Sequence, residues 1–335
     1  MQSSRKLILI FLLFSSSPVW SGFYEGFVEY EQGNYEQALQ EFRPLAEGGN
    51  AFAQLYLGIM YEKGRGVAQS FSEAIKWWRL SAEQGGAVAQ YNLGRMYALG
   101  QGVARDDGEA VKWYRVAANS GLADAQYHLG NMYATGQGIS QNYKVAAYWY
   151  RKAAEQDDAR AQLSLGILYD GAQGVPRDHQ AAANWYLKAA EQGDARAQFN
   201  LGGLFANGVG ITKNLAQAAN WYQKAAEQGD PLAQYNLAIL YDEGKGVPQD
   251  DKLAVKWYSR AAEQGLANAQ YNLAIMYHQG TGVPQDDVEA YKWLSIVAAA
   301  GNQKALGGRD GIANTMTATQ ISEAQRLFRE WINNH

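Results

Sequence analysis

Four histidines are the side chains best suited to bind a metal or transfer a proton here, but their spacing supports neither role. They are His128, His179, His278 and His335. No two of them are one helical turn apart, as two ligands on one helix face would be, and none belongs to an HExxH sequence. The chain also has no cysteine that could complete a metal site. We therefore expect no metal site, and we interpret the histidines as scattered surface residues.

Sequence motifs for nucleophilic or phosphate chemistry are also missing. No GxSxG, GxxxxGKS/T or GxGxxG stretch occurs. Glycine pairs such as Gly100 and Gly102 join two helices and follow no strand, so they are turns rather than phosphate cradles. The adjacent acids Asp106 and Asp107 lie where a helix begins, and helix capping explains them better than acid–base catalysis does. The sequence therefore predicts no enzyme, no catalytic residue and no cofactor.

The elements that position these residues follow from a repeat of 36 residues. The stretch AQYNLGRMYALGQGVARDDGEAVKWYRVAANSG, residues 89–121, recurs seven times in register. Its tryptophan recurs as Trp77, Trp113, Trp149, Trp185, Trp221, Trp257 and Trp293. In each unit, apolar residues at helical spacing, a glycine turn and a capping residue predict a helix, a reversal and a second helix. Stacked helix pairs shield one another's apolar faces, so we expect a solenoid with these tryptophans in its core.

These residues resemble the Sel-one-like repeat (SLR) family, a relative of the tetratricopeptide repeat. The matching motifs are AQYNLGRMYALGQGV from Ala89, AQYNLAILYDEGKGVPQD from Ala233, and the closing WYxxAAEQG from Trp185 and Trp221. The resemblance implies an all-α fold, a right-handed α/α superhelical solenoid of seven 36-residue helix-turn-helix repeats over residues 51–302. It also implies a non-enzymatic scaffold or adaptor that acts in envelope complex assembly, signalling or host interaction.

The segments on either side of the repeats are predicted to cap them. Residues 22–50 form an amino-terminal capping hairpin of tetratricopeptide type, and residues 303–335 form carboxy-terminal capping helices. Within the repeats, Asp157 replaces a helix-ending glycine, and Gly171 and Ala172 reverse the usual order of the turn. These departures affect the expected geometry of two turns and leave the predicted fold unchanged.

Residues 1–21 are typical of a secretory signal peptide. Arg5 and Lys6 precede a short apolar run, and the chain would be cut after Ser21. The apolar run is too short to cross the ~30 Å core of a bilayer as a helix. We therefore expect a periplasmic or secreted protein without stable membrane insertion. The alternative is that the segment remains as a membrane anchor.

The charge of the chain is close to balance. Lys and Arg number 29 and Asp and Glu number 33, for a net charge of −4. A nucleic-acid-binding protein needs a basic face, and the sequence shows none. We therefore expect neither a nucleic acid nor an anionic membrane surface as the partner.

Candidate binding residues come from the first helix of each pair, which lines the concave face in tetratricopeptide-like arrays. Repeat positions that vary between units have less of a packing role than the fixed ones. Two such positions supply the predicted peptide-binding residues: Asn92, Arg95, His128, Asn131, Asn200, Asn236 and Asn272. Asparagine can donate to and accept from the main chain of an extended peptide. The sequence therefore predicts a protein or peptide ligand on the concave surface. The alternative is that these asparagines bond to a neighbouring helix.

Two other functions fit the sequence less well. The many aromatic residues raise the possibility of glycan stacking, in a cell-wall or exopolysaccharide-associated binding protein, although the repeat accounts for most of them. A β-lactamase-like hydrolase is suggested by some cysteine-rich SLR proteins. This chain lacks their cysteines, and its SxxK motif, from Ser3 to Lys6, lies in the signal segment.

Overall fold

The computed structural model describes residues 18–334, and over that range it contains α-helices and no strand. The chain divides into two units. The first unit holds the described residues up to Ala161 together with Gln173–Val175, and the second holds Gln162–Ala172 and the residues from Pro176 onward. Most of the predicted signal segment lies outside the described residues. None of the described helices is long and apolar enough to cross a bilayer.

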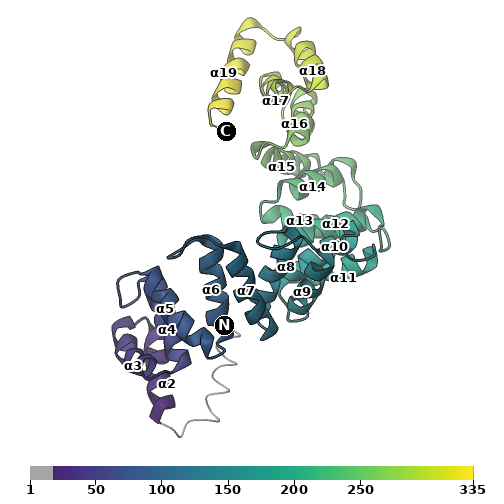
Figure 1. Ribbon diagram of the computed structural model, residues 1–335. Coiled ribbons are helices and arrows are strands. Elements are labelled where there is room, and N and C mark those ends of the chain that lie inside the picture. The colour runs from purple at the N-terminus through teal and green to yellow at the C-terminus, as the bar shows by residue number, and fades with distance from the viewer. Residues whose placement is uncertain (1–17, 335) are drawn as a thin grey trace. The chain divides into compact units, whose positions relative to one another are not determined.

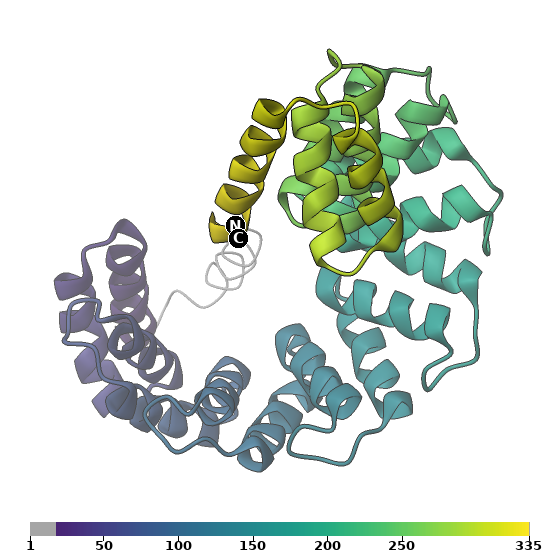
Figure 2. The ribbon, with the colours of Figure 1, turned by 90° about the horizontal axis from the view of Figure 1, so that it is seen from above.

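In each unit, consecutive helices pack against one another along the chain, except that α18 and α19 both pack on α17 (Figures 1 and 2). The first unit contains α2 (Pro18–Gln32), α3 (Tyr35–Glu47), α4 (Ala51–Lys63), α5 (Phe71–Glu83), α6 (Ala87–Leu99), α7 (Asp107–Asn119), α8 (Ala123–Thr135) and α9 (Tyr143–Ala154). Helix α10 (Ala159–Gly171) begins in the first unit and continues in the second. The second unit then contains α11 (His179–Glu191), α12 (Ala195–Asn207), α13 (Leu215–Glu227), α14 (Pro231–Glu243), α15 (Asp251–Glu263), α16 (Ala267–Gln279), α17 (Asp287–Ala299), α18 (Gln303–Ala313) and α19 (Ala318–Asn334).

Seven helix pairs, from α4/α5 to α16/α17, confirm the predicted α/α solenoid of 36-residue repeats. Each second helix begins at the predicted capping residue. The capping side chains are those of Ser70, Asp106, Asn142, Asp178, Asn214, Asp250 and Asp286, and each accepts a first-turn amide three residues on at 2.9–3.3 Å. These bonds satisfy amides that the helix itself leaves without a partner, so the cap fixes where each second helix starts.

In the core of each of the first five repeats, an aromatic ring from the second helix packs against a glycine of the first helix. A methyl group on Gly94 of α6 would stand 2.6 Å from Cδ1 of Tyr114 on α7. In the first repeat, a methyl group on Gly58 would stand 2.3 Å from Nε1 of Trp78. Only hydrogen fits such a gap, so the glycine lets the ring pack directly against the backbone of the first helix.

The recurring tryptophan is less buried than the sequence predicts. Trp221, Trp257 and Trp293 are buried, whereas Trp77, Trp113, Trp149 and Trp185 are only half-buried. The residue that follows it is the deeper one: Trp78 is 0% exposed and Tyr186 is 2% exposed. A tryptophan at the rim can keep one side of its ring on apolar neighbours and its edge in water. A lysine one turn away covers such a ring, with Nζ of Lys188 lying 4.6 Å from the ring centroid of Trp185.

The second glycine of each turn allows neighbouring repeats to approach closely. Gly246 has a φ of 77°, and a methyl group there would stand 2.4 Å from the carbonyl carbon of Leu215, in the preceding repeat. Gly138 meets Asp107 in the same way. The turn of one repeat therefore rests on the start of the second helix of the repeat before it, which only a residue without a side chain permits.

Two turns place a residue other than glycine in the left-handed region. Among the described residues, Asp157 (φ 64°) and Ala172 (φ 56°) are the only such cases. Asp157 lies two residues before α10 and Ala172 directly after it, and they are the two departures identified in the sequence. A side chain in this region crowds the neighbouring carbonyl oxygen at a cost of about 1–2 kcal/mol. Both turns therefore adopt the same left-handed conformation as the glycine turns of the other repeats, at the cost of backbone strain.

Buried glutamines connect six of the seven repeats to the helix before them, and sequence reasoning did not identify them. Nε2 of Gln126 donates to the carbonyl oxygen of Ala118 at 3.2 Å, and its Oε1 accepts from Nε2 of Gln156 at 2.8 Å. The bond between these two glutamine positions recurs in the first, fourth, fifth and sixth repeats. In the second repeat, Ser120 replaces the donor, and Oε1 of Gln90 is buried without a described partner.

Helices flank the repeats at both ends, as predicted. Helices α2 and α3 enclose Phe23 and Phe42, both fully buried with ring centroids 5.4 Å apart. At the other end, α18 and α19 both pack on α17. The rings of Trp293 on α17 and Trp331 on α19 lie 6.2 Å apart, centroid to centroid. Apolar residues at helical spacing thus hold α19 against the last repeat.

Candidate functional site

In the first unit, the predicted residues Asn92 and Arg95 lie together on α6 and are joined to the preceding repeat. Nη2 of Arg95 lies 2.9 Å from Oε1 of Glu62 on α4, and Nη1 donates to Oδ1 of Asn92 at 3.4 Å. The Glu62 side chain is 7% exposed and Asn92 is buried. The buried carboxylate of Glu62 offsets the positive charge of Arg95. The surface around Asn92 and Arg95 is therefore less cationic than the arginine alone would suggest. Arg95 connects two repeats here.

His128 on α8 lies among tyrosine rings. Its ring stacks on that of Tyr114, with centroids 5.4 Å apart and planes at 18°, and it lies 5.6 Å from the ring of Tyr91. Burial lowers the pKa of His128, and the nearby positive charge of Arg160 lowers it further. The imidazole is therefore neutral near pH 7 and contributes an aromatic face and one donor and one acceptor, with no charge.

A second ion pair borders this surface one repeat further along. Nη2 of Arg160 lies 2.7 Å from Oδ1 of Asp124 and 2.5 Å from Oδ2 of Asp158. Its guanidinium carbon lies 4.6 Å from the ring centroid of Tyr127. The hydrogen bond with Asp158 is the main cause of the raised pKa of Arg160. The half-buried ring of Tyr127 and the exposed guanidinium of Arg160 therefore form an aromatic and charged edge beside the predicted residue His128.

The other predicted residue of the first unit, Asn131, faces the second helix of its own repeat. Its Oδ1 accepts from the hydroxyl of Tyr150 at 2.6 Å. Tyr150 is buried, and a buried hydroxyl needs a partner. One role of Asn131 is therefore to satisfy that hydroxyl.

In the second unit, the predicted asparagines share one arrangement. Each interacts with the buried tyrosine of the preceding repeat: Asn200 with Tyr186, Asn236 with Tyr222 and Asn272 with Tyr258. Nδ2 of Asn272 donates to the Tyr258 hydroxyl at 3.1 Å. Burial raises the pKa of all three tyrosines, while the bond from asparagine opposes the rise. The asparagines are half-buried. Since an amide can make up to four hydrogen bonds, each of them keeps the capacity to bond to a ligand.

One hollow of the second unit includes a predicted residue. It has a volume of about 280 Å³ and is lined by residues of α10 and α12, among them Asp170, Phe199 and Asn200. Nδ1 of His179 lies 2.7 Å from Oδ1 of Asp170. The hollow therefore combines a carboxylate, an amide and an aromatic ring, which are groups that could hold the main chain and one side chain of a peptide.

Sequence reasoning missed the acidic residues of these surfaces. Glu62, Asp170 and Asp242 occupy one repeat position, which holds alanine in three other repeats. Comparing that position between repeats would have identified them. His179 and His278 are not isolated surface residues, since Nδ1 of His278 lies 2.6 Å from Oδ1 of Asp287 just as His179 meets Asp170. Among the described residues, no group of three or more His, Asp or Glu has the arrangement of a metal site.

Comparison with known proteins adds a family and a set of structures to this description. The Sel1 repeat family matches residues 51–86, 87–122, 123–158, 159–194, 195–230, 231–266 and 267–302. A Sel1 repeat protein from Oxalobacter formigenes, solved by crystallography, is 37% identical with a TM-score of 0.65, and the match covers 87% of this chain and 85% of that one. A protective antigen present in uropathogenic Escherichia coli strains, which displays an SLR fold, is 29% identical with a TM-score of 0.46, over 95% of this chain and 92% of that one. No curated protein matches the chain.

Proposed function

This chain belongs to the Sel1 repeat family, whose members are in general protein-interaction scaffolds, and we propose that it is a non-enzymatic adaptor that binds a protein or peptide. In this proposal the ligand lies along the face that the first helices α12, α14 and α16 present, the face that the sequence predicts to be concave. A ligand in extended conformation fits best, because successive repeats offer it equivalent polar groups at regular intervals.

The single observation that carries this proposal is the row of half-buried asparagines, Asn200, Asn236 and Asn272. The Asn272 amide donates to the Tyr258 hydroxyl, and the amides of Asn200 and Asn236 interact with Tyr186 and Tyr222. Such a group loses little rotamer freedom on binding, so its remaining donor and acceptor capacity is available at a small entropic cost. The hollow beside Asn200 supplies an apolar contact through Phe199. The row thus combines repeated polar contacts with one place for a side chain.

The proposed cellular setting of the adaptor rests on the signal-like sequence of residues 1–21. We propose that residues 1–21 direct export and that the protein acts in the periplasm or outside the cell, in envelope complex assembly, signalling or host interaction. Export would be tested by sequencing the amino terminus of the protein recovered from the periplasmic or culture fraction. A terminus at Gly22 supports cleavage after Ser21, and an intact Met1 on protein that stays with the cell membrane contradicts it.

The binding proposal is tested with peptides selected by display against the purified protein and with serine variants of the asparagine row. Serine is the natural residue at this position in the fourth repeat, as Ser164, and its hydroxyl can still bond to the tyrosine. The triple variant Asn200→Ser, Asn236→Ser, Asn272→Ser should therefore stay folded and bind the selected peptides about tenfold or more weakly, as expected when several hydrogen bonds of about 0.5–1.5 kcal/mol are lost.

The matched control is Asn220→Ser, on α13, where the asparagine is exposed and belongs to a second helix. Its affinity for the peptides should equal that of the wild type. If the triple variant binds as tightly as the wild type, or if Asn220→Ser weakens binding equally, the first-helix face is not the binding site. Circular dichroism melting of each variant separates a lost contact from a lost fold.

A further inference from the structure

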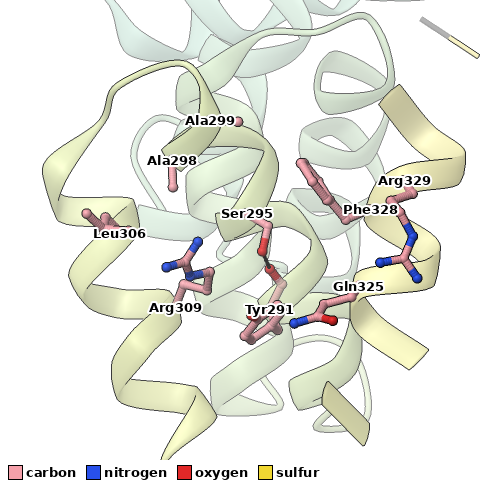
Figure 3. A pocket seen from close by; sticks show the side chains of 9 residues that line it. All are labelled: Tyr291, Ser295, Ala298, Ala299, Leu306, Arg309, Gln325, Phe328 and Arg329. Carbon is pink, nitrogen blue, oxygen red and sulfur yellow. Dashed lines mark hydrogen bonds between the residues drawn. The ribbon is translucent and has the colours of Figure 1, made fainter. Parts of the chain in front are cut away.

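A pocket separate from the repeat surface lies between the last repeat and the terminal helices. It has a volume of about 400 Å³ and is formed by α17, α18 and α19 (Figure 3). This volume is within the range of pockets that hold small organic ligands. Tyr291 on α17, Leu306 on α18 and Phe328 on α19 are among the residues that line it and give it apolar surface. The pocket is therefore large enough for a carboxylate together with the side chain or ring that carries it.

Two arginines give this pocket its charge. The side chain of Arg309 lines the pocket from α18. The side chain of Arg329, on α19, lines the opposite side beside the amide of Gln325 (Figure 3). None of the lining residues is acidic. Guanidinium groups stay protonated at any relevant pH. The pocket is therefore cationic, although the chain as a whole has a net charge of −4.

The two guanidinium groups are not equivalent. Nη2 of Arg309 lies 2.7 Å from Oδ1 of the neighbouring residue Asp310, which offsets part of its charge, and its Cζ lies 6.0 Å from the ring centroid of Tyr291. Among residues 18–334, no carboxylate pairs with Arg329, whereas Arg326, three residues before it, pairs with both Glu323 and Glu330. Two arginines and one adjacent carboxylate leave about one net positive charge, which matches a ligand with a single negative charge.

From this arrangement we infer that the pocket between α17, α18 and α19 binds a carboxylate attached to an apolar group. The planar fork of a guanidinium matches the two oxygens of a carboxylate and can bond to both of them. A carboxylate in the pocket is attracted by Arg309 from one side and by Arg329 from the other, and its apolar group packs on Tyr291, Phe328 and Leu306. A doubly charged phosphate fits less well, because the apolar walls cannot compensate for its second charge. The ligand is either a free carboxylic acid or the carboxy terminus of a peptide.

The experiment measures binding of four probes to the full-length mature protein by isothermal titration calorimetry. The probes are phenylpropanoate, a short peptide that ends in phenylalanine with a free carboxylate, the same peptide as its amide, and inorganic phosphate. We expect the carboxylates to bind and the amide and phosphate to bind at least about tenfold more weakly, since hydrogen bonds to charged groups contribute about 1.5–3 kcal/mol. Binding of phenylpropanoate alone identifies a small acid as the ligand class, and tighter binding of the peptide identifies a chain terminus.

Arginine variants locate the site. Arg329→Gln and Arg309→Gln should each weaken carboxylate binding about tenfold or more, because each removes a charged donor. Arg326→Gln is the matched control, because it removes a guanidinium from the same helix that is paired with Glu323 and Glu330, and it should leave the affinity unchanged. Melting curves check that all three variants fold. The inference is wrong if no carboxylate binds, if phosphate or the amide binds as tightly as the carboxylates, or if the three variants affect binding equally.

Discussion

The buried glutamine of the second repeat gives the sharpest prediction about stability. In five repeats, a closing glutamine donates to Oε1 of the buried glutamine at 2.8 Å. In the second repeat, Ser120 cannot reach, and Oε1 of Gln90 is buried without a described partner. The hydroxyl of Ser120 instead donates to the carbonyl oxygen of Val116 at 3.2 Å. The substitution Ser120→Gln should supply the missing donor.

The size of the effect follows from the cost of the buried acceptor. A buried polar atom without a partner costs about 1–3 kcal/mol, and ordering a glutamine side chain costs at most about 1.5–2 kcal/mol. Since the equivalent Gln84 and Gln156 are exposed, the ordering cost at this position is at the low end. We therefore expect Ser120→Gln to raise the free energy of unfolding by about 1 kcal/mol, which corresponds to a rise in Tm of about 1–2 °C for a chain of 335 residues.

The assay is urea and thermal unfolding followed by circular dichroism. Ser120→Ala is the control, because it removes the hydroxyl without supplying a donor, and it should not stabilise the protein. The reverse change, Gln156→Ser, should leave Oε1 of Gln126 without its partner and destabilise by about 1–3 kcal/mol. If Ser120→Gln is neutral and Gln156→Ser costs nothing, the glutamine bonds do not contribute to stability and the reasoning is refuted.

Three further predictions concern single positions. Ala172→Gly should raise the free energy of unfolding by about 1 kcal/mol, measured by urea unfolding, and a loss of stability would show that the left-handed backbone at Ala172 carries no strain. Tyr186→Ala should cost about 3–5 kcal/mol and Trp185→Ala clearly less, in the same assay; the opposite order would contradict their burial. The lowered pKa of His128 means that the unfolded state binds more protons between that pKa and the ordinary value of 6.5, so stability should fall as the pH drops through this window. His128→Asn introduces the residue found at the equivalent position 200, and it should remove the loss of stability between these two pH values. An unchanged dependence of stability on pH would exclude His128 as the cause.

The fold was predictable from the sequence because the repeat supplies seven copies of the same signals. The glycine turns, the capping residues and the helical spacing of apolar residues all agree within each copy, so an error in one unit would not change the result. The tryptophans show the limit of this reasoning. A recurring large aromatic residue indicates packing, but the position of Trp185 at the rim and of Tyr186 in the core depends on which of two adjacent residues points inward.

The candidate site was predictable only as a set of positions. The repeat shows that Asn200, Asn236 and Asn272 are equivalent, but their bonds to tyrosines depend on how far apart neighbouring helices lie. Arg95 illustrates the same limit, since its charge suggests a binding group until the buried Glu62 is seen beside it. The pocket around Arg309 and Arg329 could not be found from the sequence, because it requires two helices beyond the repeat to fold back onto α17.

Amide hydrogen exchange of the protein, with and without a saturating display-selected peptide, tests the proposed binding face most directly. The account predicts slower exchange in the first helices α12, α14 and α16, around Asn200, Asn236 and Asn272, with little change in α13 and α15. Protection confined to the second helices, or to α2 and α3, would contradict it.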